Sequence, residues 1–129
     1  MSVEKQTYRS GPFKEVFAQG VKVGNVLYLA GQVGVDASGI AGADMTTQIT
    51  LAYENIRRVL SKFDAALDNI VDETVFVTDM SELMANSDAV FGARAKAYGG
   101  IPEVCQTLVQ VSALVLPELK LEIKCVAHL

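Results

Sequence analysis

The spacing of hydrophobic positions predicts the first strands and the first helix. Apolar residues are concentrated in 16–23 and 26–35, and the Gly24-Asn25 pair between these runs suits a tight turn between two strands. The start of the second run is continuously apolar, so we expect a strand buried on both faces. From residue 46 to about residue 66, apolar side chains recur every three or four positions, which predicts an amphipathic helix with Asp44 as its N-cap.

The pattern changes again in the middle of the chain. Residues 70–78 are rich in β-branched side chains, which favours a strand. Asp79 and Glu82 have the spacing of a helix capping box, and the Gly99-Gly100 pair is typical of a helix end. We therefore expect a second helix from Asp79 to about residue 98.

Two further strands are predicted at 105–114 and 119–127, joined through Pro117-Glu118. In the first of them, side chains alternate between two faces. One face carries Cys105, Thr107 and Val109, and the other carries Gln106, Leu108 and Gln110. The order ββ-α-β-α-ββ predicts an α+β fold, a single domain of residues 1–129 with two helices packed on one face of a mixed sheet.

Composition narrows the possible functions. The chain has 129 residues and a formal net charge of −4, so nucleic acid is not an expected partner. It has no 18-residue apolar run, which argues against a membrane partner and favours a cytoplasmic protein. Two cysteines and one histidine cannot build a zinc site, and we expect both Cys105 and Cys125 to be small core residues. That shortage of ligands leads us to expect no metal. Phosphate-binding glycine motifs are missing as well, so we expect no cofactor.

Glu122 is the most interesting carboxylate of the chain. It lies in the middle of a predicted strand, with Lys120 and Lys124 on the same side. Neighbouring positive charges favour the ionised form of a carboxyl group. Two interpretations stay open at this point: a functional carboxylate in a cleft, and a polar position on a sheet surface or a subunit contact.

Five short motifs occur in an order that resembles one known family. They are Gln19-Gly20-Val21 with Gly24-Asn25, Tyr28-Leu29-Ala30-Gly31-Gln32, Thr74-Val75-Phe76-Val77 with Asp79, Val109-Gln110-Val111, and Leu121-Glu122-Ile123. Together they resemble the Rid family, also called YjgF or the L-PSP "endoribonuclease" family. The resemblance implies a chorismate-mutase-like fold and a homotrimer with a barrel-like core, with ligand pockets in the clefts between subunits.

The resemblance also implies a reaction, the hydrolysis of reactive enamines and imines to 2-oxo acids and ammonia. The family's glutamate corresponds to Glu122 and its asparagine to Asn86. Three family positions are changed, since Phe17 replaces a tyrosine, Ala30 a serine and Gln106 a carboxylate-binding arginine. With Glu122 as the catalytic residue, the predicted substrate-binding residues are Gln106, Asn86, Phe17, Ala30, Gly31 and Thr107.

The change at Gln106 affects the expected ligand most. An arginine offers a charged fork of donors to a carboxylate, whereas glutamine offers a neutral amide. From the usual strengths of charged and neutral hydrogen bonds, binding of a 2-imino acid would weaken by about tenfold or more. The sequence therefore leaves two main hypotheses, an enamine or imine deaminase with altered substrate preference and a non-catalytic module that binds a small ligand. A ribonuclease fits the acidic composition poorly.

Overall fold

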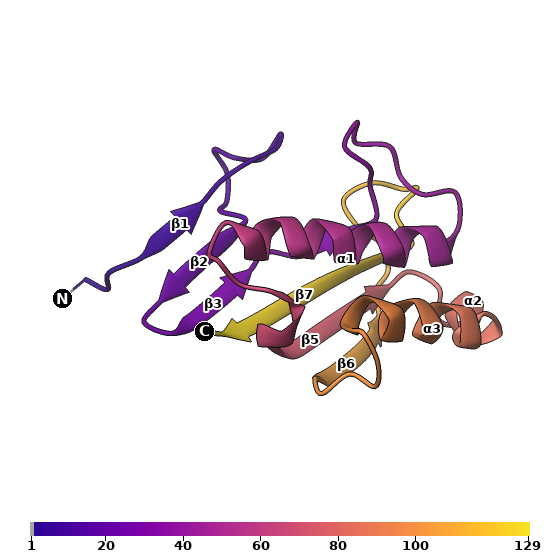
Figure 1. Cartoon of the computed structure of the whole chain (residues 1–129). Coiled ribbons are helices and arrows are strands. Elements are labelled where there is room, and N and C mark those ends of the chain that lie inside the picture. Colours follow the sequence, from indigo (N-terminus) through magenta and orange to yellow (C-terminus); the bar gives the residue numbers. More distant parts are fainter. Residues whose placement is uncertain (1) are drawn as a thin grey trace.

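Helices lie across one face of a mixed sheet in the computed structural model, which describes residues 2–129 (Figure 1). Seven strands form the sheet within these residues: β1 (Gln6–Tyr8), β2 (Gly20–Val23), β3 (Val26–Leu29), β4 (Gln32–Val33), β5 (Ile70–Val77), β6 (Cys105–Gln110) and β7 (Leu121–His128). The strand order is β1-β2-β3-β7-β5-β6, and β4 also pairs with β7. Only the β5–β6 pairing among these strands is parallel, so the expected mixed sheet is confirmed.

The helical layer consists of α1 (Met45–Ser61) and α3 (Ser87–Tyr98), which pack against each other, together with the short α2 (Met80–Ala85). A 3₁₀ turn, η1 (Leu67–Asn69), leads into β5. The core fills the space between the helices and the sheet, with Leu27, Ile56, Val75 and Ile123 almost inaccessible. The predicted α+β architecture is therefore present, and the opposite face of the sheet carries no described helix.

The first helix confirms the periodicity in the sequence. Asp44 is its N-cap, with a carboxylate oxygen 2.7 Å from the backbone nitrogen of Thr47. The apolar stripe of α1 is buried, including Ile49 and Tyr53. The helix ends at Ser61 rather than near residue 66, because the chain turns at Asp64, whose φ of 55° lies in the left-handed region.

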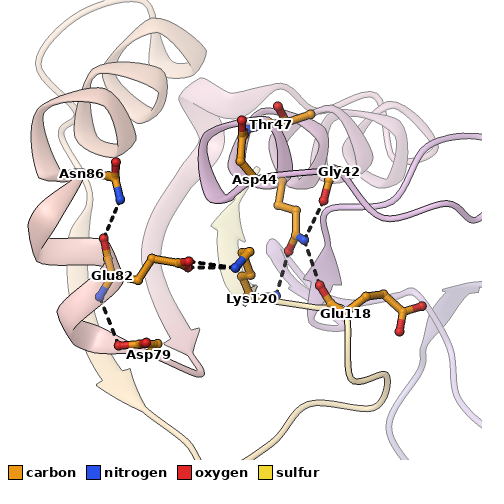
Figure 2. A network of polar contacts seen from close by, with 9 residues as sticks. Gly42, Asp44, Thr47, Asp79, Glu82, Asn86, Glu118 and Lys120 are labelled. Atoms are coloured by element: carbon orange, nitrogen blue, oxygen red, sulfur yellow. Dashed lines mark hydrogen bonds and ion pairs between the residues drawn. The ribbon is translucent and has the colours of Figure 1, made fainter.

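The second predicted helix is two helices, α2 and α3, that meet at Asn86. Asp79 caps the first of them by accepting from the Glu82 backbone nitrogen at 3.1 Å. The Glu82 carboxylate pairs with Lys120 instead of completing a capping box. Asn86 leaves helical geometry at φ −117° and ψ 22°, and its side chain donates to the Glu82 carbonyl oxygen, so the break is closed by a local hydrogen bond (Figure 2).

The early strands are shorter than predicted. Residues 16–19 precede β2, and the predicted strand 26–35 is divided into β3 and β4. The expectation of a strand buried on both faces is wrong, because Tyr28 in β3 is 48% exposed while Leu27 and Leu29 are buried. Tyr28 therefore points to the outer face of the sheet, by which we mean the face opposite the helices.

Alternation along β6 and β7 is as predicted, and in β6 the face that carries Cys105 is the one turned away from the core. In β7, Leu121, Ile123 and Cys125 point into the core, which leaves Glu122 and Lys124 on the outer face. In β6, Gln106 and Leu108 point toward the helices. Cys125 is buried as predicted.

The expectation that Cys105 is a core residue is wrong, because this cysteine is exposed. Its Sγ lies 3.2 Å from the Val71 carbonyl oxygen and 3.3 Å from the Asp72 carboxylate. The hydrogen bond to Asp72 raises the pKa of the Cys105 thiol above its usual value. This environment disfavours the thiolate and therefore nucleophilic chemistry at Cys105.

Candidate functional site

A hollow of about 640 Å³ lies where the 11–18 segment, β3 and β7 come together. Its wall is mostly apolar and includes Phe13, Val16, Phe17, Val21, Tyr28 and Val115. Its charged side chains are Glu122 and Lys124, which β7 presents side by side on the outer face. A mostly apolar concavity with a few polar groups is the usual form of a small-molecule site.

Four of the seven predicted site residues line this hollow: Phe17, Ala30, Gly31 and Glu122. They come from three separate stretches of sequence. The folding of the 11–18 segment onto the sheet brings Phe17 to the others, and the pairing of β4 with β7 brings residues 30–31 next to Glu122. The structure thus groups the part of the predicted site that surrounds Glu122.

Gly31 leaves the space that the Glu122 side chain occupies. A Cβ atom added at Gly31 would lie 2.5 Å from a Glu122 carboxylate oxygen and 2.6 Å from its Cδ. Atoms at that separation overlap, so any larger residue would displace the carboxylate. The Gly31 position therefore holds the backbone close to Glu122, and this explains glycine at this position without invoking a positive φ.

Two glutamines keep the neighbouring backbone in place. The buried Gln32 amide donates to the Gln19 side-chain oxygen at 2.8 Å and to the Ala30 carbonyl oxygen at 3.1 Å. The Ala30 backbone nitrogen donates in turn to the Gln19 carbonyl oxygen at 2.8 Å. The Gln-Gly and Gly-Gln motifs of the sequence therefore connect the residue that precedes β2 to the wall of the hollow.

The Glu122 carboxylate is half-buried and interacts weakly with its surroundings. Burial raises the pKa of Glu122 above its ordinary value, and the nearby Lys124 ammonium only partly offsets this rise. Within residues 2–129, no hydrogen bond or ion pair occupies the Glu122 side chain. A carboxylate in this condition has acceptor positions available for water or for a ligand.

Of the two lysines predicted to flank Glu122, only Lys124 lines the hollow. The Lys124 ammonium donates to the Leu29 carbonyl oxygen at 3.1 Å. Lys120 turns away and binds Glu82 of α2, with an N–O distance of 2.8 Å. Figure 2 shows this pair between α2 and the start of β7. The Lys120 backbone nitrogen also donates to the buried Gln48 amide, which itself donates to the carbonyls of Gly42 and Glu118.

The aromatic part of the wall is a short folded turn. The Phe13 carbonyl oxygen accepts from the backbone nitrogens of Val16 at 2.8 Å and Phe17 at 3.1 Å. The Phe13 and Phe17 rings stack, with centroids 5.7 Å apart and an interplanar angle of 19°. The family resemblance pointed to Phe17 alone, and the apolar side chains at positions 13 and 16 were the available signal for the rest of this wall.

The other predicted site residues lie elsewhere in the chain. Gln106 faces the helices, and its amide donates to the Glu73 carboxylate at 2.9 Å. Asn86 lies at the α2–α3 junction, bonded to Glu82. Thr107 is exposed on the outer face of β6, which is separated from β7 by β5. One chain therefore does not bring Gln106, Asn86 or Thr107 to the hollow around Glu122.

A second polar group occupies the space between the sheet and the helices. Glu73 is fully buried and accepts from Tyr98 at 2.7 Å, Tyr53 at 3.0 Å and the Arg94 Nε. Burial, followed by the charge of Glu73, raises the pKa of both tyrosines, which keeps them protonated as donors. Together with Gln106 these contacts satisfy the buried carboxylate, so this cluster anchors the helices to the sheet.

Neither a metal nor a membrane span is indicated by the part of the chain that the structure describes. Its His, Cys, Asp and Glu side chains form no group of three suited to holding a metal ion. None of its helices combines the length and the apolar character needed to cross a bilayer.

Comparison with known proteins identifies the family. The family model described as Endoribonuclease L-PSP matches residues 12–129. A RutC family protein of Pyrococcus abyssi is 30% identical over 113 residues, covering 86% of this chain and 82% of the relative. The chain belongs to the Rid/YjgF family, as its motifs suggested.

Two further comparisons bear on fold and activity. A crystal structure of a YjgF/YER057c/UK114 family member from Mycobacterium tuberculosis matches with a TM-score of 0.82 and 28% identity, covering 98% of this chain and all of that one. A protein of Escherichia coli named as a candidate reactive intermediate deaminase, TdcF, is 27% identical over 112 residues, which is 86% of this chain and 84% of that protein. The family fold is therefore confirmed.

Proposed function

We propose that this protein hydrolyses a small imine, or the enamine that tautomerises to it, in the hollow beside Glu122. The observation that carries the proposal is the half-buried Glu122 carboxylate, without a described partner, held against Gly31 in an apolar concavity. The similarity to a candidate reactive intermediate deaminase supports the same class of reaction.

The chemistry needs one water molecule and one proton acceptor. The Glu122 carboxylate accepts a proton from water as the water oxygen bonds to the C=N carbon, and the π electron pair moves to nitrogen. The nitrogen then takes up protons from Glu122 and from the new hydroxyl. The C–N bond breaks, and the products are a carbonyl compound and ammonia. Such substrates are intrinsically labile, so orientation and a single base suffice for a useful rate.

We include assembly in the proposal, with three copies that cover one another's hollows. Phe13, Val16, Phe17, Tyr28 and Val115 are all exposed around the hollow in a single chain. Large apolar surface of this kind favours association with another protein surface. In such an assembly Thr107, on the exposed outer face, is the predicted site residue best placed to meet a neighbouring hollow.

We also place the protein in the cytoplasm. Its two cysteines are unpaired, and Cys105 is exposed. Free exposed thiols are typical of a reducing compartment.

The test is release of ammonia from freshly generated 2-iminopropionate and from bulkier 2-imino acids. Glu122→Gln keeps the shape of the side chain but removes the base, so we expect a rate loss of about 100-fold. Because the pKa of Glu122 is raised, the wild-type rate should fall with decreasing pH at a midpoint above the ordinary glutamate value of 4.5. The exposed Glu118→Gln serves as the matched control.

An unchanged rate in Glu122→Gln would remove this residue from the mechanism. A second function, ligand binding without turnover, is favoured by the loss of hydroxyl groups at Phe17 and Ala30, which both line the hollow. Thermal stabilisation by a 2-oxo acid in the absence of any ammonia release would support that function instead.

A further inference from the structure

The hollow contains a positive charge that the family resemblance does not supply. Lys124 lies two residues from Glu122 on the same face of β7, and both side chains line the hollow. Gln106, at the position of the family's arginine, points to the helix side and binds Glu73. The cation that lines this hollow in the described chain is therefore Lys124.

One hydrogen bond holds the Lys124 ammonium in place and leaves its other donors available. The ammonium donates this bond to the Leu29 carbonyl oxygen at 3.1 Å, which holds the side chain over β3. An ammonium group has three donors, so two remain for a ligand. Lys124 and Glu122 influence each other electrostatically but form no ion pair within residues 2–129.

The separation of the two charges suits a small anionic substrate. Positions two apart in a strand are separated by about 6.6 Å along the chain. A carboxylate held by Lys124 would place the adjacent carbon between the two side chains, within reach of a water molecule on Glu122. Both charges come from one rigid strand at the centre of the sheet, so their spacing is fixed by the backbone.

The apolar wall of the hollow indicates which substituent the ligand carries besides its carboxylate. The stacked Phe13 and Phe17 rings, together with Val16 and Val115, form an apolar surface that is largely exposed in the single chain. Even where a neighbouring copy closes over the hollow, a ligand with only a methyl group would contact little of this wall. A branched or aromatic substituent would bury it.

We propose that Lys124 is the carboxylate anchor of the hollow and that the ligand is a 2-imino or 2-oxo acid with a bulky apolar side chain. The inference rests on the proposed function for the location of the site, but it concerns recognition and does not require turnover. Lys124 is a specificity-determining residue, and the aromatic turn at residues 13–17 selects the substituent.

Calorimetric binding of stable 2-oxo acids tests the proposal. Phenylpyruvate carries both recognised features, pyruvate lacks the ring, and phenylacetone lacks the carboxylate. Wild-type protein should bind phenylpyruvate at least about tenfold more tightly than either of the other two. Lys124→Met should weaken phenylpyruvate binding by about tenfold or more and leave phenylacetone binding unchanged. Lys124→Arg should restore much of the loss.

The controls separate this proposal from the one on catalysis. Lys22→Met removes a lysine of β2 that lies outside the hollow, and should leave all three affinities unchanged. Phe17→Ala should weaken the binding of phenylpyruvate more than the binding of pyruvate. Equal phenylpyruvate affinity in Lys124→Met and wild type, or no measurable phenylpyruvate binding, would overturn the anchor. Selective binding without ammonia release would refute the proposed reaction and leave the anchor standing.

Discussion

Gly31 and Glu122 form the contact on which the candidate site depends most directly. The carboxylate lies so close to the glycine backbone that a Cβ atom there would meet it at 2.5 Å. The contact joins the end of β3 to β7, two segments that are about ninety residues apart in sequence. The absence of a methyl group at residue 31 therefore leaves room for the acceptor oxygens of Glu122 in their observed position.

Gly31→Ala should displace the Glu122 carboxylate and reduce ammonia release strongly, by about as much as removing the base. The backbone φ at Gly31 is not positive, so the effect comes from the clash and not from backbone strain. Steady-state kinetics with a 2-imino acid measures the loss of rate.

Gly92→Ala is the matched control for that substitution. A Cβ at Gly92, inside α3, meets nothing within 4 Å. Alanine is the better helix former there and should stabilise the protein by about 0.5–1 kcal/mol without affecting the rate. An active Gly31→Ala protein would show that Glu122 can shift without cost.

At the scale of elements, two buried polar groups attach the helices to the sheet. Gln48 connects α1 to the backbone around Gly42, Glu118 and Lys120. The Glu73 cluster connects β5 to α1 and α3 through Tyr53, Arg94 and Tyr98. Removing the Gln48 amide or the Glu73 carboxylate would leave the donors and acceptors around it without a hydrogen-bond partner.

Glu73→Leu should destabilise the protein by about 3–5 kcal/mol, because it leaves the mostly buried Arg94 guanidinium without its counter-charge. Adding Arg94→Met should recover part of that loss, since no buried charge then remains. Urea denaturation followed by circular dichroism at fixed protein concentration measures both values.

Glu82→Gln is the comparison for a more accessible pair. Glu82 and Lys120 each keep 33% of their side-chain surface exposed, so breaking this pair should cost at most about 1 kcal/mol. Equal losses in Glu73→Leu and Glu82→Gln would contradict the anchoring role of the Glu73 cluster.

At the scale of the whole molecule, the two faces of the sheet differ. The helices cover one face, and Figure 1 shows no described helix on the other. That outer face carries Tyr28, Phe76, Val109 and Val126 between its polar residues. Apolar side chains on an uncovered sheet favour packing against another sheet.

We expect the purified protein to sediment with three times the 13.8 kDa mass of one chain. Val109→Glu places a charge on the outer face and should shift the protein toward single chains. Phe91→Glu changes an apolar residue on α3, at the helix side, and should leave the assembly intact. A wild-type protein that sediments as a single chain would contradict the assembly, and analytical ultracentrifugation decides the matter.

Local patterns alone determined most of the elements and the family. The 3.6-residue period of α1, the cap at Asp44, the helix end at Gly99 and the alternation along β7 each depend on residues close together in sequence. Interactions of that range can be inferred from the order of residues alone. The correspondence of Glu122 with the family's glutamate was available for the same reason.

Only the tertiary structure decided which residues meet. The sequence alone does not say which side of the sheet Gln106 faces. In the structure its amide donates to the buried Glu73 carboxylate on the parallel strand β5, which places it on the helix side. Lys120 and Lys124 look equivalent along the chain, yet one binds α2 and the other enters the hollow. These outcomes depend on partners that distant segments supply. Alternation within a strand shows which residues share a face, but it does not show which segment packs against that face.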